Sequence, residues 1–225
     1  MPEIVELKKY HDFLTNKLSN TRLCDINILS GRYSKNNNLP GFELFKKDTV
    51  MLNCFQKGKF LYLEFGDFKI AFTFGLYGGF SYNNNIILDD YYDYDVKKYY
   101  RIKFIFQDNN ELIFFDKNSW GTISIVDKKY IDTKLQKLGP DVFDIELPEF
   151  NKLIEKTKNK NEIISLFLVE QKTISGIGNY LRSEILWFAN IDPFVKICEL
   201  NETDIVGIYL AIKTIIWVYY DYDQG

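Results

Sequence analysis

The sequence predicts an α+β fold, in which an N-terminal helix and an antiparallel β-sandwich domain are followed by an all-α domain. Three observations support this order. Residues 3–18 carry apolar side chains at helical spacing, with charged residues between them. Residues 22–127 change to a period of two, which is typical of β-strands. From Lys128 onward the pattern is helical again.

The β-region contains five runs rich in β-branched and aromatic residues. They are KFLYLEF, FKIAFTF, YRIKFIF, ELIFF and TISIV, at 59–65, 68–74, 100–106, 111–115 and 122–126. Gly66–Asp67 and Asn109–Asn110 fall between such runs and are typical of hairpin turns. Strands at this spacing, without helices between them, indicate an antiparallel sandwich or barrel. The polar, tyrosine-rich residues 81–99 are expected to form a long mobile loop.

The C-terminal part is predicted to hold four helices. They fall at 149–158, 161–169, 179–189 and 203–221. Pro148 marks the start of the first helix, and Asn201 or Thr203 is the expected N-cap of the last. The most apolar segment, Val206–Tyr220, includes Lys213 and is shorter than the ~20 residues that span a bilayer. We therefore interpret it as a buried helix, and no membrane is expected as a partner.

These patterns define the expected domains. We place the β-sandwich domain at 1–127, a linker at 128–147 and the helical domain at 148–225. A cleft between two such domains is a natural binding site.

Composition excludes several kinds of site. The hydrophobic share of 46% and the charged share of 26% fit an ordinary soluble globular protein. The three cysteines lie far apart without a CxxC pair, so neither a disulfide framework nor a zinc site is indicated. His11 is the only histidine, which leaves little material for Ser-His or Cys-His catalysis. We expect no metal and no cofactor.

The net charge is informative about binding to nucleic acids, and the first residues of the chain are informative about its location in the cell. The formal net charge is −3, whereas nucleic-acid-binding proteins usually present a basic face. This net charge does not show that charges of opposite sign are concentrated in different segments, because lysines gather at 152–172 and aspartates at 89–95. Glu3 and Glu6 interrupt the start, so no signal peptide is indicated and an intracellular protein is expected.

The first residues, MPEIVE, supply a reactive amine if Met1 is removed. An α-amino group has a pKa of about 7.7–8.0, so part of it is unprotonated at neutral pH. A secondary amine such as that of Pro2 attacks a carbonyl-like carbon and gives an iminium directly. Glu3 and Glu6 follow within one helical turn, where carboxylates suit the helix N-terminus and transfer protons. Proline and glutamate are also ordinary first-turn residues, so both interpretations stay open.

Two further segments are candidate sites. Lys59 follows Gly58 at the start of a strand run, either as an exposed lysine or as a point charge that reaches into a cleft. The stretch QKTISGIGNYLRSEILWFA, at 171–189, joins a Gly-Ile-Gly turn to an amphipathic helix. Such a turn presents backbone N–H groups to an anion. A dinucleotide fingerprint would need a preceding strand and a third glycine, where this chain has a helical run and Leu181.

Together these segments resemble the Fpg/Nei family of DNA glycosylase/AP lyases, and within it endonuclease VIII. The matching motifs occur in the family's order and cover nearly the whole chain. They are PEIVE (2–6) for the N-terminus, GKFLYLEF (58–65) for the lysine hairpin, GLYGGF (75–80) for the wedge loop, LGPDVFD (138–144) for the linker and QKTISGIGNYLRSEILWFANIDP (171–193) for the helix–two-turn–helix motif.

The resemblance implies a bifunctional DNA glycosylase/AP lyase of base excision repair. Its partner would be double-stranded DNA with oxidised bases or abasic sites, and the damaged nucleotide would be flipped out of the duplex. By resemblance, Pro2 attacks C1′ of the sugar and forms a Schiff base, followed by β-elimination with or without δ-elimination. Glu3 is implied as proton donor and shuttle. Lys59 is implied to assist base loss and hold phosphate, and Glu6 to position the site.

The resemblance also implies a set of DNA-contacting residues. They are Gly75, Leu76, Tyr77, Lys137, Asn179 and Glu184. Leu76 and Tyr77 match the wedge that fills the emptied base stack, and Gly75 stands where the family has a polar residue. Lys137 replaces a family arginine at a phosphate, and Asn179 matches a phosphate-binding asparagine. The anion at the Gly-Ile-Gly turn is therefore interpreted as a DNA phosphate, held by the turn's N–H groups and Asn179.

Two departures from the family bear on specificity. DKNSW at 116–120 stands where the purine-specific branch has Asp-Pro-Arg-Arg-Phe, with Ser119 roughly in place of the key arginine. Oxidised pyrimidines are therefore the expected substrates. Trp120 fits either a wedge or ordinary packing. The family's C-terminal zinc-finger hairpin is not found after the last helix, so we expect either a shortened chain or a lost finger.

The missing hairpin motivates the alternative of a catalytically weak DNA- or lesion-binding protein of the same fold. A monomer is expected. The many Lys, Asn, Ile, Tyr and Phe residues have AT-rich codons, which favours a virus or parasite as the source. The protein would then act wherever the DNA is, including a host cytoplasm. A viral structural β-protein without preference for DNA is a third interpretation.

Overall fold

The computed structural model describes the chain except for residues 1, 36–38, 89–92, 160 and 223–225. The chain divides into two compact units. The first comprises Glu6–Lys134 together with Pro2, and the second comprises the chain from Leu135 onward together with Glu3–Val5. The first residues of the chain are therefore shared between the two units, which the sequence pattern did not indicate.

Helix α1, Ile4–Leu18, confirms the N-terminal helix. Leu7, Tyr10, Leu14 and Leu18 are fully buried in the core of the first unit. Their spacing of three or four residues places them on one face of the helix, which is why the apolar pattern predicts it.

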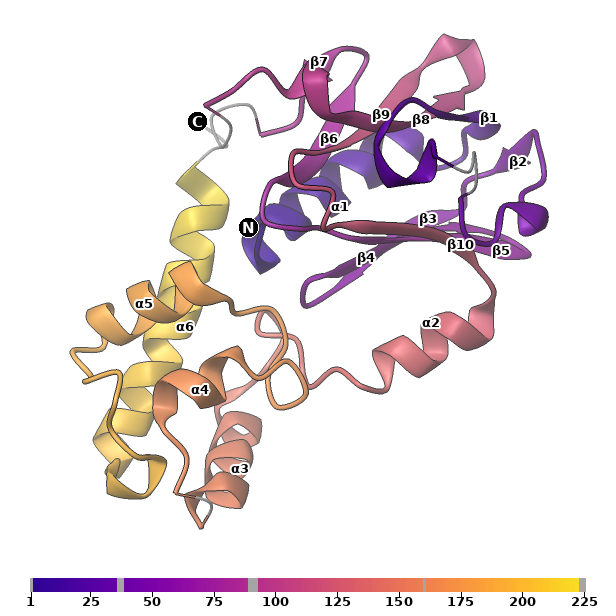
Figure 1. The fold of residues 1–225 in the computed structure, drawn as a ribbon. Coiled ribbons are helices and arrows are strands. Elements are labelled where there is room, and N and C mark those ends of the chain that lie inside the picture. The colour runs from indigo at the N-terminus through magenta and orange to yellow at the C-terminus, as the bar shows by residue number, and fades with distance from the viewer. Residues whose placement is uncertain (1, 36–38, 89–92, 160, 223–225) are drawn as a thin grey trace. The chain divides into compact units, whose positions relative to one another are not determined.

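Within the described residues, the first unit contains two antiparallel sheets (Figure 1). The strands are β1 Arg22–Ile28, β2 Thr49–Val50, β3 Asn53–Lys57, β4 Phe60–Phe65, β5 Phe68–Thr73, β6 Gly78–Tyr82, β7 Asn85–Ile86, β8 Tyr100–Phe106, β9 Glu111–Asp116 and β10 Thr122–Val126. One sheet has the order β2-β1-β8-β9-β6-β7 and the other the order β10-β5-β4-β3. Both sheets and α1 contribute side chains to one core, so the expected sandwich is confirmed.

The five predicted runs are strands β4, β5, β8, β9 and β10. The hairpin turn at Gly66–Asp67 joins β4 to β5, with Phe65 paired to Phe68. The turn between β8 and β9 is centred on Asp108 and Asn109, which both have positive φ, one residue earlier than predicted. Strands β2, β6 and β7 are not among the predicted runs. The two residues of β2 and of β7 are too few to show alternation, and the two glycines at the start of β6 have no side chains to show it.

The expected loop at 81–99 is wrong in part. Strand β6 continues to Tyr82, β7 follows at Asn85–Ile86, and a 3-10 helix spans Val96–Tyr99. Asn83 and Asn84 have positive φ and form the tight turn between β6 and β7, so residues that look like loop residues make a hairpin. Residues 89–92 of the expected mobile loop lie outside the described residues.

The remaining helices are α2 to α6. Their bounds are α2 Lys128–Leu135, α3 Leu147–Lys158, α4 Ile164–Val169, α5 Asn179–Phe188 and α6 Glu202–Tyr222. Shorter 3-10 helices span Gly31–Tyr33, Phe42–Leu44, Val96–Tyr99, Gln107–Asn109 and Ile197–Glu199. The four predicted C-terminal helices are α3 to α6, with Pro148 in the first turn of α3. Segment 128–147, expected as a linker, contains α2 and the start of α3.

Helix α4 begins three residues later than the predicted start at residue 161. Asn161 has a φ of 54°, which interrupts a right-handed helix. Ile163 then forms a bridge with Lys196, and the Ile164 nitrogen donates to the Val195 carbonyl 3.0 Å away. Pairing with a distant segment therefore displaces the start of this helix.

Helix α6 packs one face into the core of the second unit. Six of its residues are buried there, namely Ile205, Ile208, Ala211, Ile212, Ile215 and Ile216. Asn201 is its cap: Asn201 Oδ1 accepts from the Asp204 nitrogen at 3.0 Å, and the Asp204 carboxylate accepts from the Asn201 nitrogen. With 21 residues, α6 is longer than expected and is apolar enough to cross a bilayer by length and composition. Its buried face fits the core helix of a folded unit.

Candidate functional site

The Glu3 carboxylate is bound at the N-terminus of α5. Glu3 is only 1% exposed. Its Oε2 accepts from the Gly178 nitrogen at 2.6 Å and from the Leu181 nitrogen at 3.3 Å, and its Oε1 accepts from the Tyr180 nitrogen at 3.1 Å. The first N–H groups of a helix have no partner within the helix, and the helix dipole favours negative charge there. This position therefore stabilises a buried carboxylate.

The anion at the Gly-Ile-Gly turn is thus a side chain of the protein itself. The prediction that the turn's N–H groups hold a DNA phosphate is wrong for Gly178, Tyr180 and Leu181, because Glu3 occupies all three. Asn179, the first residue of α5, is exposed, and its role in DNA binding stays a prediction. The two halves of this contact are 175 residues apart, so no local pattern could have revealed it.

Two glycines permit the close approach of the N-terminus. Gly176 has a φ of 119°, and a Cβ there would collide with the Ile4 side chain. A Cβ on Gly178 would collide with the Glu3 carboxylate. The Ile4 nitrogen also donates to the Gly176 carbonyl, 3.2 Å away. The glycine pair, which suggested an external anion site, is therefore required by packing against the start of the chain.

Gln171, the first residue of the segment 171–193, stabilises the Gly-Ile-Gly turn by hydrogen bonds. Its Nε2 donates to the carbonyls of Val169 and Ile177 at 2.9 and 2.8 Å, and its Oε1 accepts from the Gly176 nitrogen at 3.0 Å. One side chain thus ties both sides of the turn together. Sequence reasoning did not assign this role to Gln171.

The motifs at 138–144 and 171–193 form one structure. The Gly139 nitrogen donates to the Gln171 carbonyl at 2.9 Å, and the Ser175 nitrogen donates to the Pro140 carbonyl at 2.8 Å. The Val142 nitrogen donates back to the Ser175 carbonyl at 3.1 Å. The Gly-Pro-Asp segment therefore supports the turn that holds Glu3.

The other N-terminal candidates flank this anchored carboxylate in the chain. Pro2 is buried and is bonded directly to Glu3 in the chain. Glu6 is half-buried in the first turn of α1. The structure therefore joins Glu3 to the helix–turn motif, an association that the sequence-based interpretation did not include.

Lys59 is half-buried in the tight turn between β3 and β4. The flanking residues Lys57 and Phe60 are paired, and Gln56 Nε2 donates to the Gly58 carbonyl at 2.7 Å. Lys59 thus lies in the turn itself, one residue before the strand. A short, hydrogen-bonded turn fixes the backbone from which this lysine extends.

The predicted wedge loop, Gly75–Tyr77, connects β5 to β6. Tyr77 is 36% exposed, and the Tyr94 hydroxyl donates to its carbonyl at 3.2 Å. The Lys117 ammonium lies 4.4 Å from the Tyr94 ring centre and 5.3 Å from the Tyr77 ring centre. Burial raises the pKa of Tyr94 to about 12, so its hydroxyl remains a donor at neutral pH. These contacts hold the loop in place.

A second exposed aromatic residue lies beside this loop. Trp120, between β9 and β10, is 66% exposed, which disfavours the interpretation of ordinary packing. A Cβ on Gly75 would collide with Trp120, so the absence of a side chain at Gly75 lets the two loops meet. Asp116 accepts from the nitrogens of Gly121 and Asn118 at 2.6 and 3.1 Å and shapes the turn that carries Trp120.

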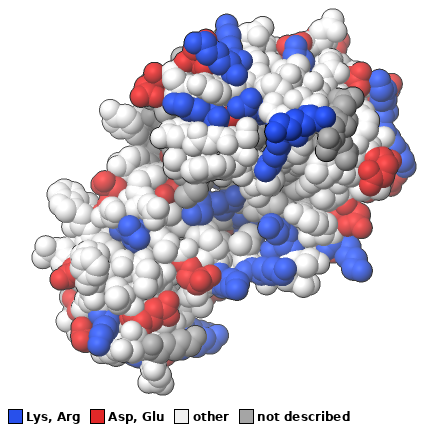
Figure 2. Space-filling view, viewed as in Figure 1, with Lys and Arg blue, Asp and Glu red and all other residues white. Residues whose placement is uncertain are grey.

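The remaining candidates lie in the C-terminal unit. Lys137 is exposed in the turn after α2, and Glu184 is half-buried on α5. Figure 2 shows Lys and Arg side chains interspersed with Asp and Glu on the face presented. Elsewhere in the chain charges are paired; in the first unit, the hydrogen bond from Lys47 holds the pKa of Asp25 below its usual value. In the described residues, no three His, Cys, Asp or Glu side chains are grouped to hold a metal ion.

Comparison with known proteins extends these observations. The family model described as the formamidopyrimidine-DNA glycosylase N-terminal domain matches residues 1–123, and that of the formamidopyrimidine-DNA glycosylase H2TH domain matches residues 138–220. The formamidopyrimidine-DNA glycosylase of Bacillus anthracis is 27% identical over 220 residues, which cover 95% of this chain and 76% of that protein. The formamidopyrimidine-DNA glycosylase of Streptococcus agalactiae is 23% identical over 218 residues, which cover 96% of this chain and 77% of that protein.

Solved structures show the same fold. The Lactococcus lactis formamidopyrimidine-DNA glycosylase bound to DNA with an AP site superposes with a TM-score of 0.81 and 22% identity, over 98% of this chain and 82% of that one. The wild-type Lactococcus lactis protein bound to DNA with an oxidised pyrimidine superposes with a TM-score of 0.82 and 22% identity. The superposition covers 98% of this chain and 80% of that one. The predicted α+β fold with a helix–two-turn–helix domain is therefore confirmed, whereas the closer resemblance to endonuclease VIII stays a prediction.

Proposed function

The chain belongs to the formamidopyrimidine-DNA glycosylase family, and we propose from this premise that it is a bifunctional DNA glycosylase/AP lyase of base excision repair. Its partner is double-stranded DNA with oxidised bases or abasic sites. The observation that carries the proposal is the buried Glu3 carboxylate, bound by three N–H groups of the helix–two-turn–helix domain directly beside Pro2.

The proposed chemistry begins with removal of Met1, which converts Pro2 from an amide into a secondary amine. The amine lone pair attacks C1′, the bond between C1′ and the base breaks, and the base leaves with that electron pair and takes up a proton. Loss of the amine proton to Glu3 frees the nitrogen lone pair, which expels the ring oxygen. The C1′–O4′ bond breaks, O4′ takes up a proton, and an iminium with the ring-opened sugar remains. Removal of a C2′ proton then expels the 3′ phosphate by β-elimination, and δ-elimination can follow.

Glu3 is suited to move the protons in these steps. Three backbone donors stabilise its ionised form, so it acts first as an acceptor for the proton released from the Pro2 amine. Once protonated, it donates to the ring oxygen as the sugar ring opens. The three backbone hydrogen bonds hold this carboxylate in place next to the amine in each of these steps.

We assign supporting roles to the other candidates. Lys59 assists base loss and holds a phosphate, and Glu6 positions the site. Leu76 and Tyr77 fill the emptied stack, with Gly75 permitting the loop's approach to its neighbour. Lys137 and Asn179 bind phosphate oxygens, and Glu184 faces the site. Because Ser119 replaces an arginine of the purine-specific branch, we propose that oxidised pyrimidines are the favoured substrates.

Borohydride trapping tests the reaction. The chain is prepared with Met1 removed, its N-terminal mass is verified, and it is incubated with a duplex that contains an abasic site or an oxidised pyrimidine. We expect a covalent adduct that peptide mapping assigns to Pro2. The matched control is the same chain with Met1 retained, which should bind the duplex without forming the adduct.

The alternative is a catalytically weak DNA- or lesion-binding protein of the same fold. Specific duplex binding without any adduct from the Met1-free chain would favour it and overturn the proposed enzyme. Faster single-turnover excision of an oxidised purine than of an oxidised pyrimidine would overturn only the substrate preference. Since DNA is the partner, we place the protein inside a cell, wherever that DNA is.

A further inference from the structure

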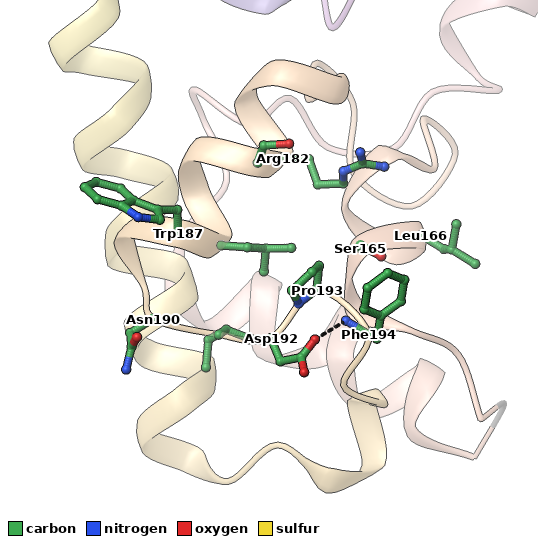
Figure 3. A pocket seen from close by; sticks show the side chains of 11 residues that line it. Ser165, Leu166, Arg182, Trp187, Asn190, Asp192, Pro193 and Phe194 are labelled. Carbon is green, nitrogen blue, oxygen red and sulfur yellow. Dashed lines mark hydrogen bonds between the residues drawn. The ribbon is translucent and has the colours of Figure 1, made fainter.

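A pocket in the C-terminal unit lies between α4, α5 and the turn that follows α5 (Figure 3). Its volume of about 670 Å³ falls within the roughly 300–1,000 Å³ typical of ligand sites. None of its lining residues is among those assigned above to catalysis or DNA contact. The lining consists of Ser165, Leu166, Arg182, Ser183, Leu186, Trp187, Asn190, Ile191, Asp192, Pro193 and Phe194.

The pocket combines a buried apolar floor with exposed apolar side chains around it. Leu186 is 2% exposed, whereas Trp187 is 78% exposed, Phe194 76% and Leu166 56%. Large apolar side chains gathered around a concave surface mark an interaction site, because leaving them in water is unfavourable. Tryptophan is also among the residues that most often dominate the energetics of protein interfaces.

Two polar side chains in the same pocket have no side-chain partner among the described residues. Ser165 is 8% exposed, and Arg182 is half-buried. In the part of the chain that the structure describes, neither side chain makes a hydrogen bond or ion pair. Figure 3 shows Arg182, Ser165 and Phe194 on one side of the pocket, and Trp187 and Asn190 on the other.

The neighbouring acid does not neutralise this arginine. Asp192 Oδ1 accepts from the Phe194 nitrogen at 2.8 Å and thereby shapes the turn that carries Phe194 (Figure 3). No ion pair between Asp192 and Arg182 is found among the described residues. A guanidinium has five N–H donors and pairs most strongly with a carboxylate, so the pocket is complementary to an acidic group next to an apolar one.

We propose that this pocket binds a peptide segment of a partner protein, which inserts an aromatic or aliphatic side chain over Leu186 and places an acidic side chain against Arg182 and Ser165. A peptide fits better than a small metabolite because the exposed rings of Trp187 and Phe194 require a longer covering surface. The pocket would thus recruit another protein to the enzyme, a function separate from the proposed base excision.

Three short peptides test the proposal on the full chain. The acidic probe is acetyl-Ser-Glu-Phe-Glu-Ser-amide, its neutral match replaces both Glu by Gln, and the third probe replaces Phe by Ala. Binding is followed by the indole N–H signal of Trp187 and the backbone amide signals around the pocket in NMR spectra. We expect the acidic probe to bind about tenfold more tightly than the neutral one, and the alanine probe not to bind measurably.

Arg182→Gln should abolish the preference for the acidic probe while leaving the affinity for the neutral probe unchanged. Arg22→Gln, in the other unit, is the matched control and should preserve the preference. Equal affinities for acidic and neutral probes, or no binding of any probe to a chain with a dispersed spectrum, would overturn the proposal. So would signals around the pocket that move with duplex DNA alone, or with protein concentration alone, since DNA or a second copy would then be the occupant.

Discussion

The Glu3 carboxylate lies 2.6 Å from the backbone nitrogen of Gly178, across 175 residues of sequence. This contact joins the proposed catalytic N-terminus to the helix–two-turn–helix domain, and a side chain on Gly178 would displace it. The element that resembles an anion site for a ligand is occupied by a residue of the protein. A structural contact and a proposed catalytic group therefore coincide at Glu3.

Gly178→Ala should destabilise the protein by about 1–3 kcal/mol, because the added methyl collides with the Glu3 carboxylate. Urea unfolding of both chains measures the change. Gly207→Ala in α6 is the matched control: nothing lies within 4 Å of its Cβ, so the substitution should be neutral or stabilising by up to about 1 kcal/mol. Equal destabilisation by both substitutions would contradict the packing argument.

Glu3→Gln should slow the chemical step by about 10²–10⁴-fold, since a neutral amide cannot accept the amine proton. The amide oxygen can replace only part of the hydrogen bonding to Gly178, Tyr180 and Leu181. A loss of about 1.5–3 kcal/mol in unfolding free energy is therefore also expected. Single-turnover excision with saturating protein separates the rate from binding. An unchanged rate would exclude Glu3 as the proton shuttle.

Lys137→Ala and Asn179→Ala should weaken binding to damaged and undamaged duplexes alike, because phosphate contacts carry little sequence information. The two variants should differ in salt dependence. Loss of one charged phosphate contact at Lys137 lowers the slope of log affinity against log salt by about 0.9, whereas loss of the neutral Asn179 side chain leaves it nearly unchanged. Affinities measured over a salt series test this, and a loss confined to one lesion would oppose the assignment.

Tyr94 should contribute stability that disappears at high pH. Burial raises its pKa from the usual 10.0 to about 12. Its protonated form is therefore favoured in the folded state, so the contribution is complete below pH 10 and is lost as the pH rises toward 12. The difference in unfolding free energy between the natural chain and Tyr94→Phe, measured across this range, should shrink with pH. A constant difference would show that the hydroxyl does not titrate there.

Much of the fold follows from local patterns. The helical spacing of Leu7, Leu14 and Leu18 predicts α1, and alternation within 100–106 predicts β8. Such patterns suffice because each records which face of one element is buried. Short β7 and displaced α4 escape this logic, since the tight turn at Asn83 and Asn84 sets the bounds of β7, and pairing of Ile163 with the distant Lys196 sets the start of α4.

The sequence by itself determined the order of helix, β-sandwich and helical domain, and it supplied the motifs that carry the family resemblance. Only the tertiary structure decided what the Gly-Ile-Gly turn binds. A turn sequence shows that N–H groups are available, but the nearest anion depends on which distant residue the fold brings there. Glu3 is that residue, because packing of Ile4 against Gly176 places the start of the chain on the turn.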